Sequence, residues 1–210
     1  SHEYIVIGGD FNGDAKSDIG IYDYANGVLK VAFSTGSSFS KIDAPWVELS
    51  KTAGSWQPYS SWQPFSGNFN ADRFTDFGLY NRDSGEIRIA RGTGSGFSNF
   101  TTWLTANDSN KNYAAVTGDF NGDSLTDICL FKKSDVSFKV VLSNTKEFKD
   151  LSEWLLNFAT NKDLLVSDFN NDGLTDVGYW DRPKTWHYAI STGATFKDMG
   201  IWLDTVGNSN

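Results

Sequence analysis

Short apolar runs alternate with polar turns along the whole chain, and no apolar period of 3.6 residues is sustained. In each of four stretches, a first apolar run leads into an Asp/Asn-rich loop, and a second run follows that loop directly. A third run ends in a Ser/Gly/Thr/Asn turn, after which come a phenylalanine and then a tryptophan with an apolar neighbour. Short apolar runs bounded by turn residues are typical of β-strands. We therefore expect four strands per stretch, which in the first stretch cover residues 4–7, 19–22, 29–33 and 46–47.

The four stretches recur at intervals of 58, 51 and 49 residues. A repeat of about 50 residues with four strands and one aromatic signature is typical of a propeller blade. One blade cannot bury both faces of its sheet, so neighbours must stack, and the repeated aromatic residues are expected in the core between them. These residues are Phe39, Phe97, Phe148 and Phe196, together with Trp46, Trp103, Trp154 and Trp202.

The pattern thus predicts an all-β chain that forms one repeat domain over residues 1–210, a β-propeller-type array of four four-stranded blades. The blades are expected at about 1–50, 56–108, 112–157 and 162–205. Four blades could close into a ring or form an arc of a larger propeller, and the pattern leaves both arrangements open. Residues 50–61 lengthen the first interval, and because Pro58 and Pro64 cannot donate to a sheet ladder, we expect a loop leading into an edge strand.

Composition narrows the class of protein. Hydrophobic residues make up 39% of the chain, which is enough for a core, and no 18 apolar residues run consecutively, which argues against membrane insertion. The net charge of −8 without a basic cluster argues against nucleic-acid binding. The single cysteine, Cys129, excludes an intramolecular disulfide, and two histidines argue against a thiolate or histidine metal site.

The Asp/Asn-rich loops carry the candidate chemistry. Oxygen-bearing side chains stand at positions 1, 3, 5 and 9 of each nine-residue loop, and position 7 would offer its backbone carbonyl. A hard divalent cation needs six to eight oxygens, which such a loop can wrap around it. The candidate ligands are Asp10, Asn12, Asp14, Lys16 and Asp18; Asn68, Asn70, Asp72, Phe74 and Asp76; Asp119, Asn121, Asp123, Leu125 and Asp127; and Asp168, Asn170, Asp172, Leu174 and Asp176.

These loops differ from an EF-hand because position 12 is apolar where an EF-hand has a bidentate Glu. The position-9 carboxylate must therefore close the site. Eleven of the 26 acidic residues lie in the four loops, so up to four cations would neutralise the net charge. Oxygen-only cages favour Ca²⁺ over Mg²⁺, and the second loop, with Asn68 at position 1, should bind most weakly. The alternative is that the Asp and Asn residues form tight turns without a metal.

The Asp-x-Asn-x-Asp-x-x-x-Asp loops within blade-length repeats resemble the FG-GAP/VCBS family, which is known from integrin α-subunit propellers and many bacterial surface and secreted proteins. The resemblance implies a β-propeller with one calcium ion per matching loop, between the first two strands of a blade. It also implies a non-catalytic adhesion, lectin-like or scaffold role outside the cell. Four repeats depart from the seven usual in the family.

No nucleophile–base pair is evident, and His187, between Trp186 and Tyr188, is expected to be structural. We therefore expect no enzymatic activity. Exposed aromatic rings next to amides and carboxylates are typical of sugar-binding sites. The first candidates are Trp56, Tyr59 and Trp62, which lie outside the repeat pattern, and the second are Trp180 and Trp186. Alternatively, Trp56 and Trp62 pack over a blade edge.

Together these features predict a calcium-binding recognition module, adhesin- or lectin-like, of a secreted or surface protein. Its partner would be a glycan or protein ligand on a cell surface or matrix, with further domains of the same parent chain possible. The alternative is an accessory or scaffold region of a larger secreted enzyme or toxin.

Overall fold

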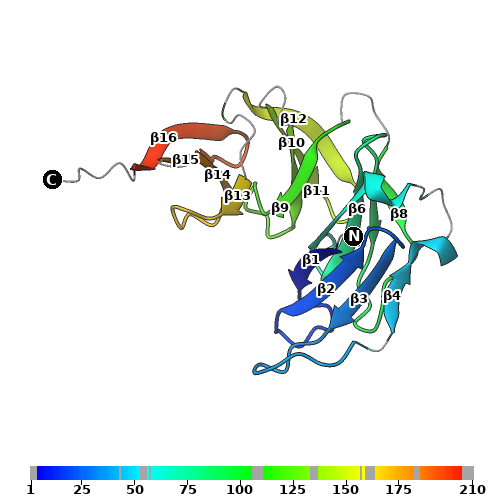
Figure 1. Ribbon diagram of the computed structural model, residues 1–210. Coiled ribbons are helices and arrows are strands. Elements are labelled where there is room, and N and C mark those ends of the chain that lie inside the picture. Colours follow the sequence, from blue (N-terminus) through cyan, green and yellow to red (C-terminus); the bar gives the residue numbers. More distant parts are fainter. Residues whose placement is uncertain are drawn as a thin grey trace. The chain divides into compact units, whose positions relative to one another are not determined.

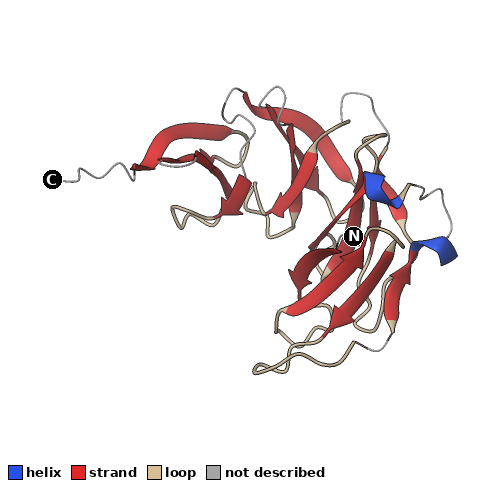
Figure 2. Ribbon diagram, viewed as in Figure 1, coloured by secondary structure: helices blue, strands red, loops and turns tan. Residues whose placement is uncertain are grey.

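The computed structural model describes residues 4–42, 44–52, 56, 58–105, 111–132, 137–156, 158, 164–181 and 185–204. Strands and turns make up nearly all of these residues (Figure 2). The helices in this part of the chain are two single 3-10 turns, η1 (Leu49–Lys51) and η2 (Tyr59–Ser61), which form the two ends of the segment 50–61 that the sequence predicts to be a plain loop. None of the helices in these residues has the length and apolar character needed to cross a membrane.

Sixteen strands in the described residues form four antiparallel sheets, each with its four strands in chain order (Figure 1). Blade 1 contains β1 (Tyr4–Gly9), β2 (Asp18–Asp23), β3 (Val28–Ala32) and β4 (Pro45–Glu48). Blade 2 contains β5 (Trp62–Gly67), β6 (Asp76–Asn81), β7 (Ile87–Ala90) and β8 (Thr101–Leu104). Blade 3 contains β9 (Ala114–Gly118), β10 (Asp127–Lys132), β11 (Ser137–Ser143) and β12 (Phe148–Leu156). Blade 4 contains β13 (Leu164–Ser167), β14 (Asp176–Asp181), β15 (Thr185–Ser191) and β16 (Phe196–Asp204).

This arrangement confirms the predicted all-β, propeller-type array of four-stranded blades. Pro64 lies in β5, an edge strand of its sheet, as its missing N–H requires. In every blade the register between the third and fourth strands shifts at the same place, which is Leu29/Lys30 in blade 1 and Trp186/His187 in blade 4. The repeat therefore includes this register shift, although no single residue type marks its position in the sequence.

The chain divides into two compact units. The first is Ser1–Asn112 with Thr145–Glu147 and contains blades 1 and 2, while the second is Tyr113–Asn144 with Phe148–Asn210 and contains blades 3 and 4. Each unit has a core shared by its two blades. In the first unit Phe11, Tyr22 and Leu29 of blade 1 are buried against Phe77 and Leu79 of blade 2. In the second, the core joins Phe120, Phe131, Phe138 and Val140 of blade 3 to Val177, Tyr179 and Ala189 of blade 4.

The same ring contact joins the blades within each unit. Phe97 of blade 2 packs edge-on against Phe11 and Trp46 of blade 1, with ring centroids 6.0 and 5.3 Å away. Phe196 of blade 4 meets Phe120 and Trp154 of blade 3 in the same way, at 5.7 and 5.1 Å. We call Phe97 and Phe196 the inserted rings, and each Phe/Trp pair that receives one a ring pair. Edge-to-face contacts at these distances add to the free energy of simple area burial.

The expectation that all repeated aromatic residues lie in the core is partly wrong. Phe148, Phe196, Trp103 and Trp154 are buried, and Phe97 and Trp46 are half-buried. Phe39 and Trp202, however, are 50% and 51% exposed. Phe39 has the repeat position of an inserted ring, and Trp202 that of a ring-pair tryptophan, so the same repeat position is exposed in one blade and covered in another.

Candidate functional site

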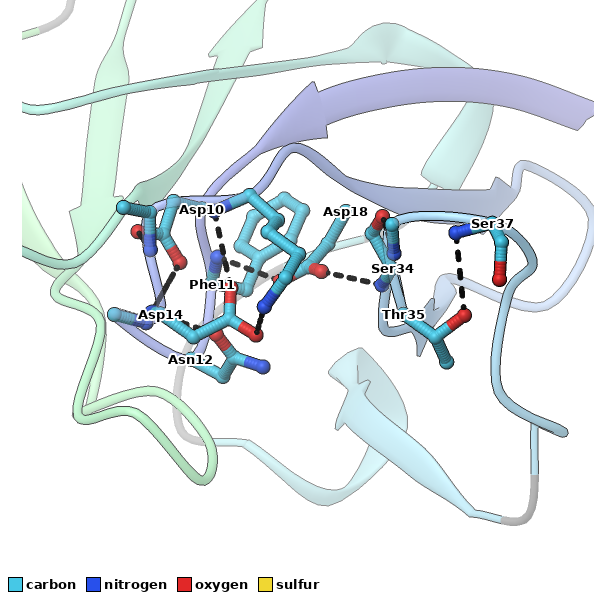
Figure 3. A network of polar contacts seen from close by, with 12 residues as sticks. Asp10, Phe11, Asn12, Asp14, Asp18, Ser34, Thr35 and Ser37 are labelled. Carbon is cyan, nitrogen blue, oxygen red and sulfur yellow. Dashed lines mark hydrogen bonds and ion pairs between the residues drawn. The ribbon is translucent and has the colours of Figure 1, made fainter.

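The four Asp/Asn loops each join the first strand of a blade to the second, and their last carboxylate is buried. In blade 1 the two oxygens of Asp18 accept the backbone N–H groups of Phe11, at 3.0 Å, and Ser34, at 2.7 Å (Figure 3). The position-9 aspartate thus ties its own loop to the turn between the third and fourth strands. Asp76, Asp127 and Asp176 make the same pair of bonds at 2.8–3.1 Å.

The position-1 carboxylate is the centre around which three of the loops wrap. Asp10 accepts N–H groups from Gly13 and Ala15, both at 2.7 Å, and from Asp14 at 3.1 Å. Asp119 and Asp168 bind their loops in the same manner. The backbone is left-handed at positions 4 and 6, where loop 1 has Gly13 (φ 78°) and Ala15 (φ 64°). The strain at Ala15 is offset by the bond that its N–H makes to the carboxylate.

Positions 3 and 5 also direct their oxygens at the loop backbone. The Oδ1 atoms of Asn12, Asn70, Asn121 and Asn170 each accept the N–H two residues on, at 3.0 Å. Position 5 repeats this with the N–H of position 7, whose residues are Lys16, Phe74, Leu125 and Leu174. In loop 1 the second oxygen of Asp14 pairs with the Lys16 ammonium at 2.8 Å, which lowers the pKa of the Asp14 carboxyl.

Loop 2 differs from the others because an amide replaces the first carboxylate. Asn68 turns its Nδ2 towards the carbonyl of Asp72, at 2.5 Å, where a carboxylate would accept N–H groups instead. Position 6 is Arg73, which is absent from the left-handed residues of this loop, where only Ala71 (φ 64°) adopts that conformation. The residue predicted to weaken this site therefore also changes how the loop folds.

Burial raises the pKa of the position-9 carboxyls. The pKa of Asp76 rises to about 6 and that of Asp127 to about 7, because desolvation outweighs their backbone hydrogen bonds. The pKa of Asp176 is raised for the same reason. A cation near these groups would favour their ionised form. The exposed Asp168 has a lowered pKa, held down mainly by the N–H of Gly173.

The donor set fits a hard cation in its chemistry, because every candidate ligand offers oxygen. Its arrangement is less complete. Among the described residues, which include all four loops, no three His, Cys, Asp or Glu side chains gather into a group that could hold a metal. Apart from position 1 of loop 2, the oxygens at positions 1, 3, 5 and 9 accept hydrogen bonds from the loop or its neighbouring turn. A carboxylate oxygen has two acceptor sites, so an oxygen that accepts one such bond can still contact a cation. The Oδ1 atoms of Asp10 and Asp119 each accept two N–H groups and would have to give one up.

The first candidates for ligand binding, Trp56 and Trp62, are buried, so the prediction that they are exposed is wrong. They are 4% and 1% exposed and belong to the core of the first unit. Their rings lie 4.9 Å apart, Trp56 also packs on Phe100, and the Arg88 guanidinium lies over both indoles at 4.5 and 4.9 Å. The two tryptophans therefore pack at a blade edge, the alternative that the sequence left open.

The remaining candidates are less buried. Tyr59 is half-buried and packs against the core of the first unit. Trp180 and Trp186 are half-buried partners across β14 and β15, with ring centroids 6.4 Å apart. His187 stacks on Tyr179 at 4.7 Å and hydrogen-bonds to Thr185, as expected for a structural histidine.

A groove that the sequence did not reveal lies between blades 1 and 2 within the first unit. The half-buried ring of Trp46 lines it, together with Phe97 and Phe100. Its polar lining is Glu48, Lys51, Thr52, Ser98 and Asn99, with a 2.6 Å ion pair between Glu48 and Lys51. Lys51 and Thr52 belong to the insertion that only the first repeat carries. That insertion is the sequence feature that could have indicated the groove, at the end before Trp56.

No protein-family model and no curated protein sequence matches the chain. Solved structures do match, and two of them are compared with the chain below. A lectin from Agrocybe aegerita, described for its specific recognition of non-reducing terminal N-acetylglucosamine, aligns with a TM-score of 0.70 and 18% identity over 97% of this chain and 53% of its own. The Tc holotoxin pore of Photorhabdus luminescens aligns with a TM-score of 0.59 and 13% identity, over 98% of this chain and 9% of its own.

These likenesses show the fold. At such low identity they carry nothing further about this chain by themselves. The chain spans about half the length of the lectin and a small part of the toxin chain.

Proposed function

We propose that this chain is a calcium-stabilised, non-catalytic recognition module of a secreted or surface protein, and that it binds glycans in the groove beside Trp46. The observation that carries the proposal is the groove itself, where one aromatic face meets several hydrogen-bonding side chains. The aromatic face would stack on the C–H surface of a sugar ring. Glu48, Thr52 and Asn99 line the same groove and would bind the hydroxyl or acetamido groups.

The likeness to a lectin supports a glycan over other ligands, and its named sugar makes terminal N-acetylglucosamine the first probe. The charge of the groove lining also suits this ligand. Glu48 and Lys51 form an ion pair, so the lining offers donors and acceptors without a strong net charge. A neutral, polyhydroxylated ligand is therefore favoured over an anion or a cation.

Calcium binding is the second part of the proposal. The side chains at positions 1, 3, 5 and 9 of each loop would hold the ion, which would neutralise clustered carboxylates and stiffen the loop. Loops 1, 3 and 4, which wrap around an aspartate, support this proposal best. Extracellular modules bind calcium with dissociation constants of about 10⁻⁴ to 10⁻³ M, so the proposal implies a calcium-rich compartment outside the cell.

A scaffold role within a larger secreted enzyme or toxin is the second candidate. The likeness to a small part of the Tc holotoxin pore favours it. In that case the groove would bind no sugar, and the blade faces would be the functional surface.

A glycan array that includes terminal N-acetylglucosamine, probed in calcium and in EDTA, tests the proposal. Asn99→Ala removes an exposed polar side chain from the groove, and Ser95→Ala makes a similar change in the same turn outside it. We expect the wild type and the Ser95 variant to bind equally and the Asn99 variant to bind less. Trp46→Phe, which keeps an aromatic core ring, should also bind less. Silence on the array, or equal binding by all four proteins, would contradict the proposal and favour the scaffold role.

A further inference from the structure

We infer that the sheet face of blade 4 that carries Phe169 and Trp202 is a docking surface for blade 1 of a second copy of this chain, with Phe39 as the inserted ring. The inference is independent of the glycan groove, which lies on other strands. It begins from the two inter-blade contacts already described, in which a phenylalanine from one blade enters the ring pair of the blade before it.

Blade 4 presents a complete but uncovered ring pair. Phe169 and Trp202 have ring centroids 5.5 Å apart, compared with 6.3 Å for Phe11–Trp46 and 6.5 Å for Phe120–Trp154. Around this pair lie three further aromatic rings on the same sheet face, those of Tyr188, Trp186 and Trp180. In blades 1 and 3 the equivalent phenylalanines, Phe11 and Phe120, are fully buried, whereas Phe169 is only half-buried and Trp202 is 51% exposed.

Blade 1 presents the other half of the contact. Phe39 lies in the turn between β3 and β4, the position of the inserted rings Phe97 and Phe196, and it is 50% exposed. Val6 on β1 is 66% exposed, although its equivalent in blade 2, Pro64, is buried and that in blade 4, Leu164, packs against a core. An apolar surface of this kind marks an interaction site on a soluble protein.

Continuity with an existing interface favours a second copy as the occupant. The exposed halves are the two different sides of one contact that already occurs twice in the chain, so a head-to-tail association extends that contact.

The residues at two further repeat positions, a glycine and a threonine in the existing contacts, limit how closely the two copies could approach. In both existing contacts a threonine N–H donates to the position-1 carbonyl of the preceding loop, Thr75 to Asp10 at 2.8 Å and Thr175 to Asp119 at 2.7 Å. The glycine before that loop is required, because a Cβ on Gly9 or Gly118 would lie 2.4 Å from the threonine methyl.

Blade 4 has Ser167 at the glycine position, and blade 1 has Ser17 at the threonine position. Ser17 lacks the methyl group that would be closest, but its Cβ would still be crowded by that of Ser167. The contact between copies must therefore be slightly wider than the two within the chain. The association should be weak, and Ser167→Gly should strengthen it.

Sedimentation velocity over a concentration series tests the inference with the 210-residue chain. We expect wild type to self-associate, and Phe39→Ala and Trp202→Ala each to weaken association by at least about tenfold. Mixing the two variants should restore a pair, since one keeps Trp202 and the other keeps Phe39. Met199→Ala, which removes another exposed apolar side chain from β16, should behave like wild type. Thermal unfolding of each variant checks that it is folded.

Several results would overturn the inference. Wild type that stays monomeric at every concentration excludes a second copy as the occupant, and so does a mixture of the two variants that fails to pair. A Phe39 variant that lowers the melting temperature of a monomeric protein would point to a contact within one chain. Loss of glycan binding in Trp186→Ala or Trp202→Ala, without any change in sedimentation, would make this face a ligand site.

Discussion

In the first unit the ring-pair tryptophan, Trp46, is half-buried and borders a groove, whereas its equivalent in the second unit, Trp154, is only 3% exposed. The turn that carries the inserted ring accounts for the difference. In the second unit the Thr195 hydroxyl donates to the Trp154 carbonyl at 2.7 Å and holds the turn against β12. The first unit has Gly96 at that position and offers no hydroxyl.

The contacts that the units share are those that hold blades together, and the residues in which they differ lie at the groove and at loop 2. The inserted ring, the threonine-to-carbonyl bond and the position-9 aspartate recur in both units. Gly96 and Asn68, by contrast, are departures from the repeat in the first unit, and they alter a groove and a loop. The shared contacts therefore form a repeated framework, and the groove and the altered loop are local differences of the first unit.

The largest effect is expected at the framework aspartate of loop 3. Asp127→Ala leaves the buried N–H groups of Phe120 and Ser143 without their acceptor, which should cost about 2 to 6 kcal/mol in the free energy of unfolding. Asp123→Ala in the same loop changes an exposed side chain and should cost less than about 1 kcal/mol in EDTA. Urea unfolding measures both. Equal costs would show that position 9 has no framework role beyond that of a loop residue.

The cost in unfolding free energy of replacing an inserted ring, or Phe39 at the equivalent position, by alanine should increase with the burial of the ring. Phe196→Ala removes a ring that is 4% exposed and should cost about 3 to 5 kcal/mol. Phe97→Ala, at the half-buried equivalent, should cost about 1 to 3 kcal/mol. Phe39→Ala, at a concentration where the protein is monomeric, should change stability by less than about 0.5 kcal/mol. The same chemical denaturation series compares all three, and a different order would break the equivalence drawn between the blades.

Replacing Gly96 should make the first unit resemble the second. A Cβ at Gly96 meets nothing within 4 Å, and its φ is not left-handed, so Gly96→Thr is sterically allowed. The new hydroxyl should reach the Trp46 carbonyl, close the groove and weaken glycan binding by about two- to tenfold. Ser95→Thr in the same turn is the matched control. Calorimetric titration with the best array ligand measures the effect. Unchanged affinity would show that the ligand does not bind in the groove.

The smallest effect is expected in loop 2, where a substitution should increase the stability that calcium adds. Asn68→Asp supplies the position-1 carboxylate around which the other loops wrap. At roughly millimolar calcium, a site of the extracellular class would add about 0.4 to 1.4 kcal/mol of stability. Asn26→Asp adds the same charge in the β2–β3 turn, outside the loops. If both variants respond equally to calcium, the effect is one of net charge and not of a loop site.

Much of the fold could be predicted because the same pattern of strands and turns occurs four times in the sequence. Each strand core was visible as an apolar run, and Pro64 correctly indicated an edge strand. The burial of Trp56 could not be predicted, since it depends on Phe100 and Arg88, which are distant in the sequence. The exposure of Phe39 and Trp202 was equally hidden, because a repeat pattern is the same whether or not a neighbouring blade covers the residue.

Alternating oxygens identified the loops, and Asn68 stands in the loop whose hydrogen bonds differ from the others. Calcium binding by the loops, weakest at loop 2, stays a prediction. The pattern did not show that position 9 ties the loop to a turn about 16 residues further on, because that bond depends on how strands pair. The groove depends on two blades meeting, and no local motif encodes such a meeting.

Calcium-dependent stability tests the central proposal most directly. Thermal unfolding would be recorded in EDTA and in millimolar calcium, and calorimetry on the same sample would count the bound ions. The account predicts a clear rise in melting temperature with three or four equivalents bound, the site of loop 2 being the weakest. An unchanged melting temperature with no bound calcium would contradict it, and the Asp/Asn loops would then be turns that hold the blades together without a metal.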